Sequence, residues 1–226
     1  MAADLAARLS AIEGKVEAAC ARSGRRREEV TLIAVTKTFG PDLVEAALAA
    51  GMRDLGENRV QEAREKVARA AGRARWHLIG HLQSNKAKEA VALFDCIQTI
   101  DSEALAEKVG RHAEDAGKSL DVLIQVNVGG EMQKSGVAPE EIAAVARAVD
   151  AHRSLRLRGL MTIPPLLPGE SVRPFFRTLR ELRERARETW PGCRDLSMGM
   201  SDDFEVAIEE GATMIRLGRA LFGERT

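Results

Sequence analysis

Short apolar segments rich in β-branched residues alternate with amphipathic segments along the whole chain, and this alternation limits the fold more than any other feature. A short apolar run indicates a buried strand, whereas a spacing of three to four residues indicates a helix. We expect strands at 32–38, 53–55, 76–80, 96–100, 121–127, 155–160, 194–197 and 213–217. We expect helices at 3–22, 41–50, 59–70, from about 84, at 103–116, 139–150, 173–189 and 202–210, and a last turn at 220–222.

Eight strand–helix units of this kind predict an α/β protein with a parallel sheet. The 226 residues suit a single (β/α)₈ TIM barrel, whose usual length is about 250 residues. An open doubly wound sheet is the alternative, but the first turn after a strand has no GxGxxG pattern. We expect one barrel domain over 1–226, with an extra N-terminal helix at 3–22.

The composition excludes several classes of function. Lys and Arg number 34 and balance 34 Asp and Glu, so net charge favours neither nucleic acid nor an anionic membrane as a partner. The three cysteines have no CxxC spacing, which is typical of a reducing compartment rather than of a disulfide framework or zinc site. No apolar run approaches the roughly 20 residues of a membrane span, and the N-terminus does not resemble a signal peptide. We expect a cytoplasmic protein.

Lys37 is the first candidate site residue. It follows the apolar run Leu32–Val35 and the β-branched Thr36, and Pro41 then begins a helix. A strand-end lysine in a barrel lies at the mouth of the site, where partial desolvation lowers its pKa and makes its amine a nucleophile toward a carbonyl. The alternative is a lysine that only reaches for solvent.

Two glycine-containing turns after the last two strands form the second candidate. Loops after strands seven and eight of such barrels often bind phosphate. Gly199 and Gly218 allow the backbone to approach a ligand closely, and Ser201 adds a hydroxyl. The alternative is that Ser201 only caps its own helix and that the glycines serve tight turns.

A lysine amine and a phosphate site at one barrel mouth suggest pyridoxal 5′-phosphate (PLP), which has an aldehyde at one end and a phosphate at the other. Arg216 lies between them on the last strand and is placed to meet the ring nitrogen; its alternative role is an ion pair with Glu57. His77 and His81 are four residues apart on a strand and its loop, so they do not share a helical face, and we expect no metal site.

Several segments in order along the chain resemble the pyridoxal-phosphate homeostasis protein family (YggS/PROSC). They are Ala34–Lys37, Leu55–Asn58, His77–Lys86, Lys134–Gly136, Gly159–Met161, Leu196–Ser201 and Ile215–Gly218. The resemblance covers about residues 30–223. It implies a barrel of the alanine racemase N-terminal type, with PLP held as an aldimine on Lys37 and with Asn58, Ser201, Arg216 and Gly218 in its pocket.

The resemblance also implies a role in PLP homeostasis, in which the cofactor is stored and handed to apo PLP-dependent enzymes. The alternative is a PLP-dependent amino-acid racemase, but an arginine at the ring nitrogen makes a weak electron sink, and the chain has no tyrosine to act as a second base. A third hypothesis is a phosphosugar-binding barrel with Lys37 in aldol chemistry. We expect a PLP-binding monomer without catalytic residues.

The loop 129–136 is the last candidate. Its glycines are compatible with a flap near the site. Lys134 is either a solvated side chain, which we favour, or a second amine.

Overall fold

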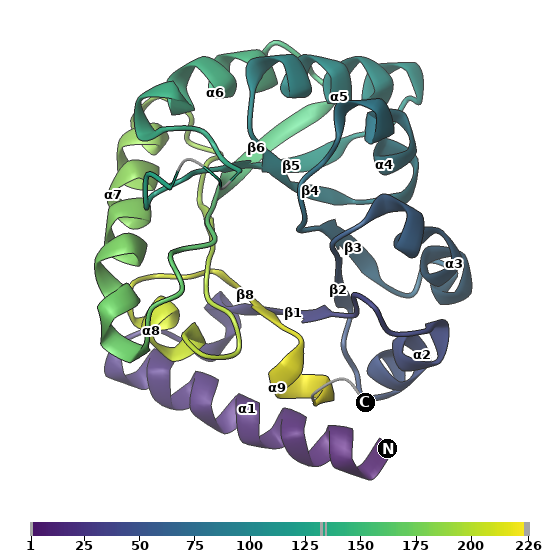
Figure 1. Ribbon diagram of the computed structural model, residues 1–226, viewed down its shortest axis with the longest axis vertical. Helices are drawn as coiled ribbons and strands as arrows, with labels where there is room; N and C mark the ends of the chain where they lie inside the picture. Colours follow the sequence, from purple (N-terminus) through teal and green to yellow (C-terminus); the bar gives the residue numbers. More distant parts are fainter. Residues whose placement is uncertain (1, 132, 134, 224–226) are drawn as a thin grey trace.

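Eight parallel strands form a closed barrel in the computed structural model, which describes residues 2–131, 133 and 135–223 (Figure 1). The strand order follows the sequence, and β1 pairs with β8 to close the barrel, with Ile33 beside Arg216. The strands are β1 (Thr31–Val35), β2 (Asp54–Glu57), β3 (Arg75–Leu78), β4 (Cys96–Ile100), β5 (Leu120–Gln125), β6 (Leu155–Met161), β7 (Asp195–Ser197) and β8 (Met214–Leu217). The predicted (β/α)₈ barrel is confirmed, and the open sheet is excluded.

The helices form a ring outside the barrel, as Figure 1 shows. They are α1 (Ala2–Arg22), α2 (Pro41–Ala49), α3 (Val60–Ala70), α4 (Ala87–Leu93), α5 (Glu103–Asp115), α6 (Ile142–Asp150), α7 (Arg173–Thr189), α8 (Phe204–Glu209) and α9 (Arg219–Phe222). Four 3₁₀ turns occur among the described residues, at Arg27–Glu29, Ser84–Lys86, Pro139–Glu141 and Gly169–Val172.

The expected helix at 202–210 is wrong at its start, because α8 begins at Phe204. The carboxylate of Asp203 accepts a hydrogen bond from the Met200 amide at 2.6 Å, so the preceding residues form a turn. Likewise, Ser84 begins a 3₁₀ turn before α4 rather than the α-helix itself. The expected cap at Ser102 is present, since its hydroxyl accepts from the Leu105 amide at 3.2 Å.

Two apolar regions stabilise the barrel. The larger lies between the strands and the surrounding helices. The smaller lies inside the barrel and consists of Ile33, Cys96, Leu123, Met161 and Met214. Buried polar side chains accompany it from neighbouring strands, namely His77, Gln98, Ser197 and Arg216. The barrel interior is therefore part apolar and part polar.

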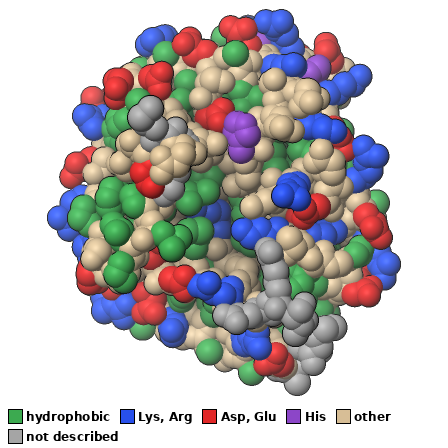
Figure 2. Space-filling model, in the orientation of Figure 1, with side chains coloured by type: hydrophobic (Ala, Val, Ile, Leu, Met, Phe, Trp, Pro, Cys, Tyr) green, Lys and Arg blue, Asp and Glu red, His purple; other side chains and the backbone are tan. Residues whose placement is uncertain are grey.

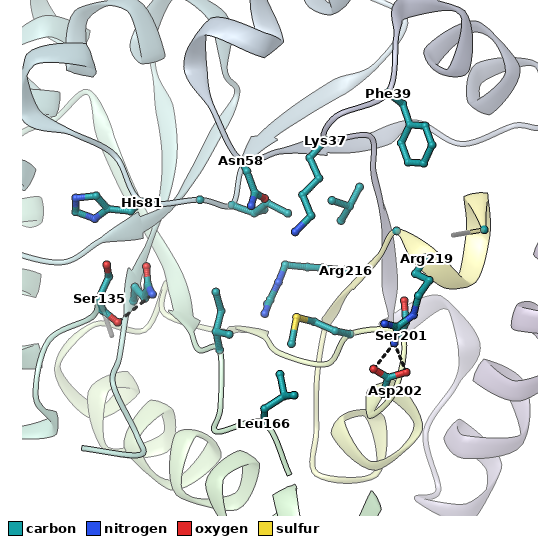
Figure 3. Close-up of a pocket in the computed structure, with 18 of the residues that line it drawn as sticks. Lys37, Phe39, Asn58, His81, Ser135, Leu166, Ser201, Asp202, Arg216 and Arg219 are labelled. Carbon is teal, nitrogen blue, oxygen red and sulfur yellow. Dashed lines mark hydrogen bonds and ion pairs between the residues drawn. The ribbon is translucent and has the colours of Figure 1, made fainter. Parts of the chain in front are cut away.

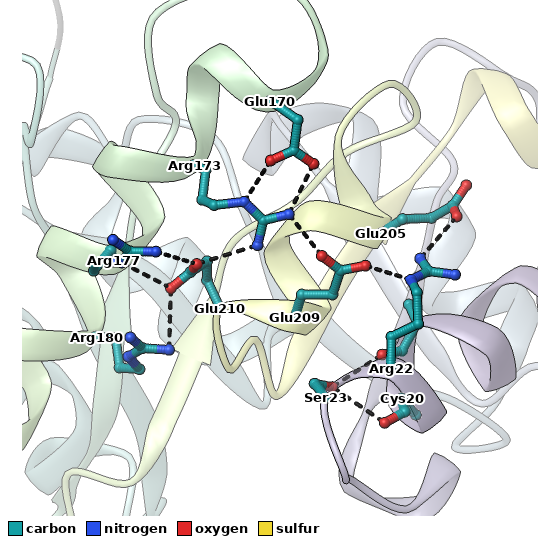
Figure 4. Close-up of polar contacts among 11 residues, drawn as sticks. Cys20, Arg22, Ser23, Glu170, Arg173, Arg177, Arg180, Glu205, Glu209 and Glu210 are labelled. Atoms are coloured by element: carbon teal, nitrogen blue, oxygen red, sulfur yellow. Dashed lines mark hydrogen bonds and ion pairs between the residues drawn. The ribbon is translucent and has the colours of Figure 1, made fainter.

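The expected extra N-terminal helix is α1, which packs on α8 and α9 beside the β1–β8 seam (Figure 1). Its apolar face is buried through Leu5, Ile12, Val16 and Ala19. Arg22 at its end donates to Glu209 at 2.6 Å, and the same carboxylate bonds Arg173 of α7, also at 2.6 Å (Figure 4). Charged contacts thus connect the first helix to the last third of the chain.

None of the helices in the described ranges combines the length and the apolar composition needed to cross a membrane.

Candidate functional site

A pocket of about 910 Å³ opens at the carboxyl ends of the strands. Figure 2 shows Lys and Arg side chains in and around the central hollow, and hydrophobic side chains gathered at one side of it. The exposed hydrophobic residues Ile163 and Leu166 come from the loop after β6 and line the pocket. All five predicted cofactor-binding residues line it as well: Lys37, Asn58, Ser201, Arg216 and Gly218.

Lys37 lies two residues beyond the end of β1 and is half-buried. Thr36 before it is fully buried, and Thr38 after it has a φ of +66°, in the left-handed region that threonine rarely adopts. The chain turns sharply at this point. In Figure 3 the side chains of Lys37 and Arg216 extend into the same space.

Helix α3 holds both sides of the Lys37 turn. Lys66 donates to the carbonyl oxygen of Thr36 at 2.7 Å, and Glu62, one helical turn earlier, accepts from the Thr38 amide at 3.2 Å. The Lys66 amine also bonds Glu57 Oε1 at 2.6 Å. The alternative role for Arg216, an ion pair with Glu57, is wrong, because the Arg216 guanidinium donates to the Ser197 hydroxyl and the Thr162 carbonyl instead.

Glu57 is a fully buried carboxylate next to the Lys37 turn. Burial raises its pKa, while the bonds from Lys66 and from the Thr36 hydroxyl (2.6 Å) oppose that shift. Its Oε2 atom has no hydrogen-bond partner among the described residues. The ion pair with Lys66 is thus the main compensation for this charge.

Arg216 lies on β8 with only 4% of its surface exposed. Its NH1 group donates to the Ser197 hydroxyl and its NH2 group to the Thr162 carbonyl, both at 2.8 Å. Burial lowers the pKa of the guanidinium to about 10, with Asp203 acting in the opposite direction, so the group stays positively charged at neutral pH.

The wall after β7 and β8 contains Met200, Ser201, Gly218 and Arg219. The Ser201 hydroxyl accepts from the Ala220 amide at 3.1 Å, so it links the two loops and does not cap its own helix. Arg219 is exposed and pairs with Asp202 (Figure 3). Ser201 and Gly218 thus lie on one wall of the pocket, and their role in binding phosphate stays a prediction.

The two glycines that the sequence predicted in these turns differ, and only Gly218 lines the pocket. Gly199 has a φ of +95°, and an added Cβ would lie 2.6 Å from Ala207 Cβ, so a side chain does not fit. Gly218 has a φ of −117°, and a Cβ would lie 3.4 Å from Val35 O, an ordinary contact. The backbone conformation and the close contact therefore require glycine at position 199. At position 218 a side chain would fit, and glycine instead leaves space in the pocket for a ligand.

The sequence did not point to several of the residues that line the pocket, among them Gln125 and Leu166. Gln125 ends β5, where the expected strand ran on to Asn127. Asn127 instead closes the following loop by donating to the Glu131 carbonyl at 2.9 Å. Leu166 comes from the loop after β6, and no local pattern places it in the pocket. Ser135 belongs to the loop 129–136, which the sequence suggested as a flap near the site, and it lines the pocket. Lys134 lies outside the described residues, so its expected position stays untested.

The two histidines of the HLIGH segment lie in different places. His77 is fully buried inside the barrel, and His81 is exposed at the rim, where its Nδ1 lies 3.0 Å from Asp101 Oδ2. Within the described ranges, no three His, Cys, Asp or Glu side chains gather as metal ligands would.

Residues 8–226 match the family of the alanine racemase N-terminal domain. The chain is 43% identical over 221 residues to the pyridoxal phosphate homeostasis protein of Aquifex aeolicus, covering 96% of this chain and 97% of that protein. It is 40% identical over 228 residues to the Escherichia coli K12 protein of the same name, covering 98% and 97%.

Solved structures agree with these relationships. PipY of Synechococcus elongatus PCC7942, solved with PLP bound, superposes with a TM-score of 0.84 at 38% identity, over 97% of this chain and all of PipY. An alanine racemase of Clostridium difficile 630 superposes with a TM-score of 0.79 at 14% identity, which shows a shared fold; the match covers 98% of this chain and 57% of the racemase. The chain therefore belongs to the family of the pyridoxal phosphate homeostasis proteins.

Proposed function

We propose that the chain binds PLP in the pocket at the carboxyl ends of the strands, holds it covalently on Lys37, and stores and hands on the cofactor within the cell. One observation carries the proposal: Lys37, Ser201 and Arg216 line one pocket although they come from separate parts of the barrel. The names of the relatives and the PLP-bound PipY structure support it.

The chemistry of the pocket residues fits PLP. When bound, PLP supplies an aldehyde that an amine can attack with loss of water, and a phosphate at its other end. Lys37 offers the amine, whereas the Ser201 hydroxyl and the Arg219 guanidinium offer hydrogen-bond donors to an anion. The pocket volume of about 910 Å³ lies in the usual range for small-molecule sites.

The remaining predicted residues orient the ligand. Arg216 has only donors, so it binds a lone pair such as that of an unprotonated ring nitrogen. Asn58 offers both a donor and an acceptor, and Gly218 leaves its own part of the wall free of a side chain. Each of these roles is part of the proposal.

Storage is favoured over racemisation by the groups available for proton transfer. Racemisation needs a base on each face of the substrate. The chain has no tyrosine, and the one histidine among the described lining residues, His81, is half exposed and bonded to Asp101. Arg216 is not a base at neutral pH, since its pKa is about 10.

Replacement of Lys37 tests the proposal. The purified protein should show the absorption of a lysine-bound PLP, and borohydride should fix the cofactor onto the peptide that contains Lys37. Lys37→Ala should lose this band and keep its fold, because the side chain is only half-buried. Lys108→Ala, an exposed lysine on α5, is the matched control and should keep the band. A pyridoxyl group mapped to another residue, with Lys37 unmodified, would contradict the assignment.

Solvent-deuterium exchange separates the carrier from the racemase. The protein is incubated in D₂O with alanine and other amino acids, beside Lys37→Ala. We expect negligible exchange at Cα. Lys37-dependent exchange on the order of 1 s⁻¹ or faster, a typical enzymatic rate, would establish the racemase instead.

The proposal extends to the molecule as a whole: a single barrel domain, a monomer and a cytoplasmic location. All three cysteines are free and buried, which supports a reducing compartment. We propose apo PLP-dependent enzymes as recipients of the cofactor. An apo enzyme that gained no activity from the loaded protein would argue against delivery but not against storage.

A further inference from the structure

A continuous series of hydrogen bonds runs through the barrel interior behind Arg216. Arg216 NH1 donates to Ser197 Oγ (2.8 Å), and Ser197 Oγ donates to Gln98 Oε1 (2.6 Å). Gln98 Nε2 lies 3.1 Å from His77 Nδ1, and His77 Nε2 lies 2.9 Å from Asp54 Oδ1. Ser197, Gln98 and His77 are each fully buried.

The series crosses the molecule. Gln98 is on β4 and Ser197 on β7, which are not neighbours in the barrel, so their bond spans the interior. Asp54 begins β2 at the end opposite the pocket, and a quarter of its side chain (25%) is exposed. The five side chains therefore connect the pocket to the opposite end of the barrel.

The chemistry of the end groups fixes the direction of every bond. Arg216 only donates, so Ser197 Oγ accepts from it and its own hydrogen needs another acceptor, which is Gln98 Oε1. The Gln98 amide then presents its NH₂ group to His77 Nδ1, which must be the unprotonated nitrogen. His77 therefore carries its hydrogen on Nε2 and donates it to the Asp54 carboxylate.

The reverse arrangement leaves groups unsatisfied. With the Gln98 amide turned over, its NH₂ would face Ser197 Oγ and the serine hydrogen would lose this acceptor. An uncharged His77 would then point a lone pair at the Asp54 carboxylate. Buried polar groups without partners are costly, so the first arrangement is the stable one.

We propose that Ser197, Gln98, His77 and Asp54 are positioning residues for Arg216, and that their directed hydrogen bonds set the orientation in which the guanidinium meets the bound ligand. This inference rests on the proposed function, because it concerns how Arg216 meets PLP. It also assigns a role to His77, whose place in the HLIGH segment suggested no function from the sequence. Within the described residues, the guanidinium donates hydrogen bonds only to neutral oxygen atoms, and the carboxylate of the series, Asp54, lies at its far end.

The first test needs no cofactor. Long-range ¹H–¹⁵N NMR of the cofactor-free protein should show the hydrogen of His77 on Nε2 and an unprotonated Nδ1. Gln98→Met, which keeps the side-chain volume but removes the amide, should shift the Nδ1 resonance as its hydrogen bond is lost. A hydrogen on Nδ1 in the unsubstituted protein would overturn the inferred direction.

The second test measures the effect on the ligand. Gln98→Met should raise the Kd for PLP about tenfold, because a guanidinium that is no longer held in its orientation loses one charge-assisted hydrogen bond to the ligand. The substitution should also shift the absorption maximum of the loaded protein. Cys96→Ala is the matched control, since Cys96 is fully buried on the same strand and inside the barrel but outside the hydrogen-bond series. Cys96→Ala should lower the melting temperature and leave the Kd for PLP and the absorption maximum unchanged.

The outcomes distinguish the two proposals. If Gln98→Met lost only thermal stability, as Cys96→Ala does, the positioning role would be refuted while PLP binding stood. If the unsubstituted protein did not bind PLP, the proposed function itself would fail, and the positioning role with it.

Discussion

Gly80 is the pocket residue with the least room for a side chain. An added Cβ would lie 2.2 Å from the carbonyl oxygen of Asn58 and 2.8 Å from its Cα, both backbone atoms that cannot turn away. Gly80→Ala must therefore displace the end of β2 and with it Asn58. We expect a loss of about 1–3 kcal/mol of unfolding free energy and weaker PLP binding, measured by denaturant unfolding and by titration.

The matched control is Gly14→Ala in the exposed middle of α1, where a Cβ meets nothing within 4 Å. The same change should stabilise the protein there by about 0.5–1 kcal/mol, because alanine loses less backbone entropy in a helix. Equal effects at the two positions would show that the contact with Asn58 is not tight.

Ser201 is the residue whose replacement tests the phosphate end of the site. Its hydroxyl lines the pocket and bonds the Ala220 amide, so Ser201→Ala removes one donor to an anion and loosens the link between two loops. We expect PLP affinity to fall about tenfold, and pyridoxal without its phosphate to bind more weakly than PLP in the unsubstituted protein. Equal affinity for pyridoxal and PLP in equilibrium titrations would contradict the assignment.

At the scale of elements, α3 determines the geometry of the Lys37 turn through Glu62 and Lys66. Lys66→Met leaves Glu57 buried without its ion-pair partner and should cost about 3–5 kcal/mol. The double variant Lys66→Met with Glu57→Gln removes the unpaired charge and should be more stable than the single one. Chemical denaturation of both variants measures the difference, and equal stabilities would refute the role of the unpaired charge.

The stability of Lys66→Met should also depend on pH. Burial already raises the pKa of Glu57, and loss of Lys66 removes an interaction that lowers it. Folded Glu57 then holds a proton at pH values where the unfolded carboxyl, with a pKa of about 4.3, has lost it. The unfolding free energy that Lys66→Met loses relative to the unsubstituted protein is therefore greatest above the pKa of Glu57 in the folded variant. This loss shrinks as the pH falls through that pKa. A deficit independent of pH in this range would exclude Glu57 as its source.

At the scale of the whole molecule, the barrel and its helices bury all three thiols. Burial raises the pKa of Cys193 to about 12 and also raises the pKa values of Cys20 and Cys96. Since the thiolate is the reactive form, an aromatic disulfide reagent at about pH 8 should find no fast-reacting thiol in the native protein and three in denaturant. A native thiol that reacts within seconds would show that one of these sites opens readily.

The sequence by itself determined the number, type and order of the strands and most helices, because these depend on local patterns of apolar residues and on proline and glycine signals. It also predicted Lys37, since a strand followed by a helix places the strand-end residue at the mouth of a barrel. Local signals were less reliable at turns: α8 begins at Phe204 because the Asp203 side chain bonds the Met200 amide.

Only the tertiary structure decided which distant polar groups meet. Gln98 and Ser197 are 99 residues apart, and Lys66 and Thr36 are 30 residues apart. No pattern along the chain selects these partners, because closure of the barrel sets which side chains face one another. For the same reason the sequence suggested Glu57 as an ion-pair partner of Arg216. In the structure Glu57 pairs with Lys66, and Arg216 begins the series of hydrogen bonds that ends at Asp54.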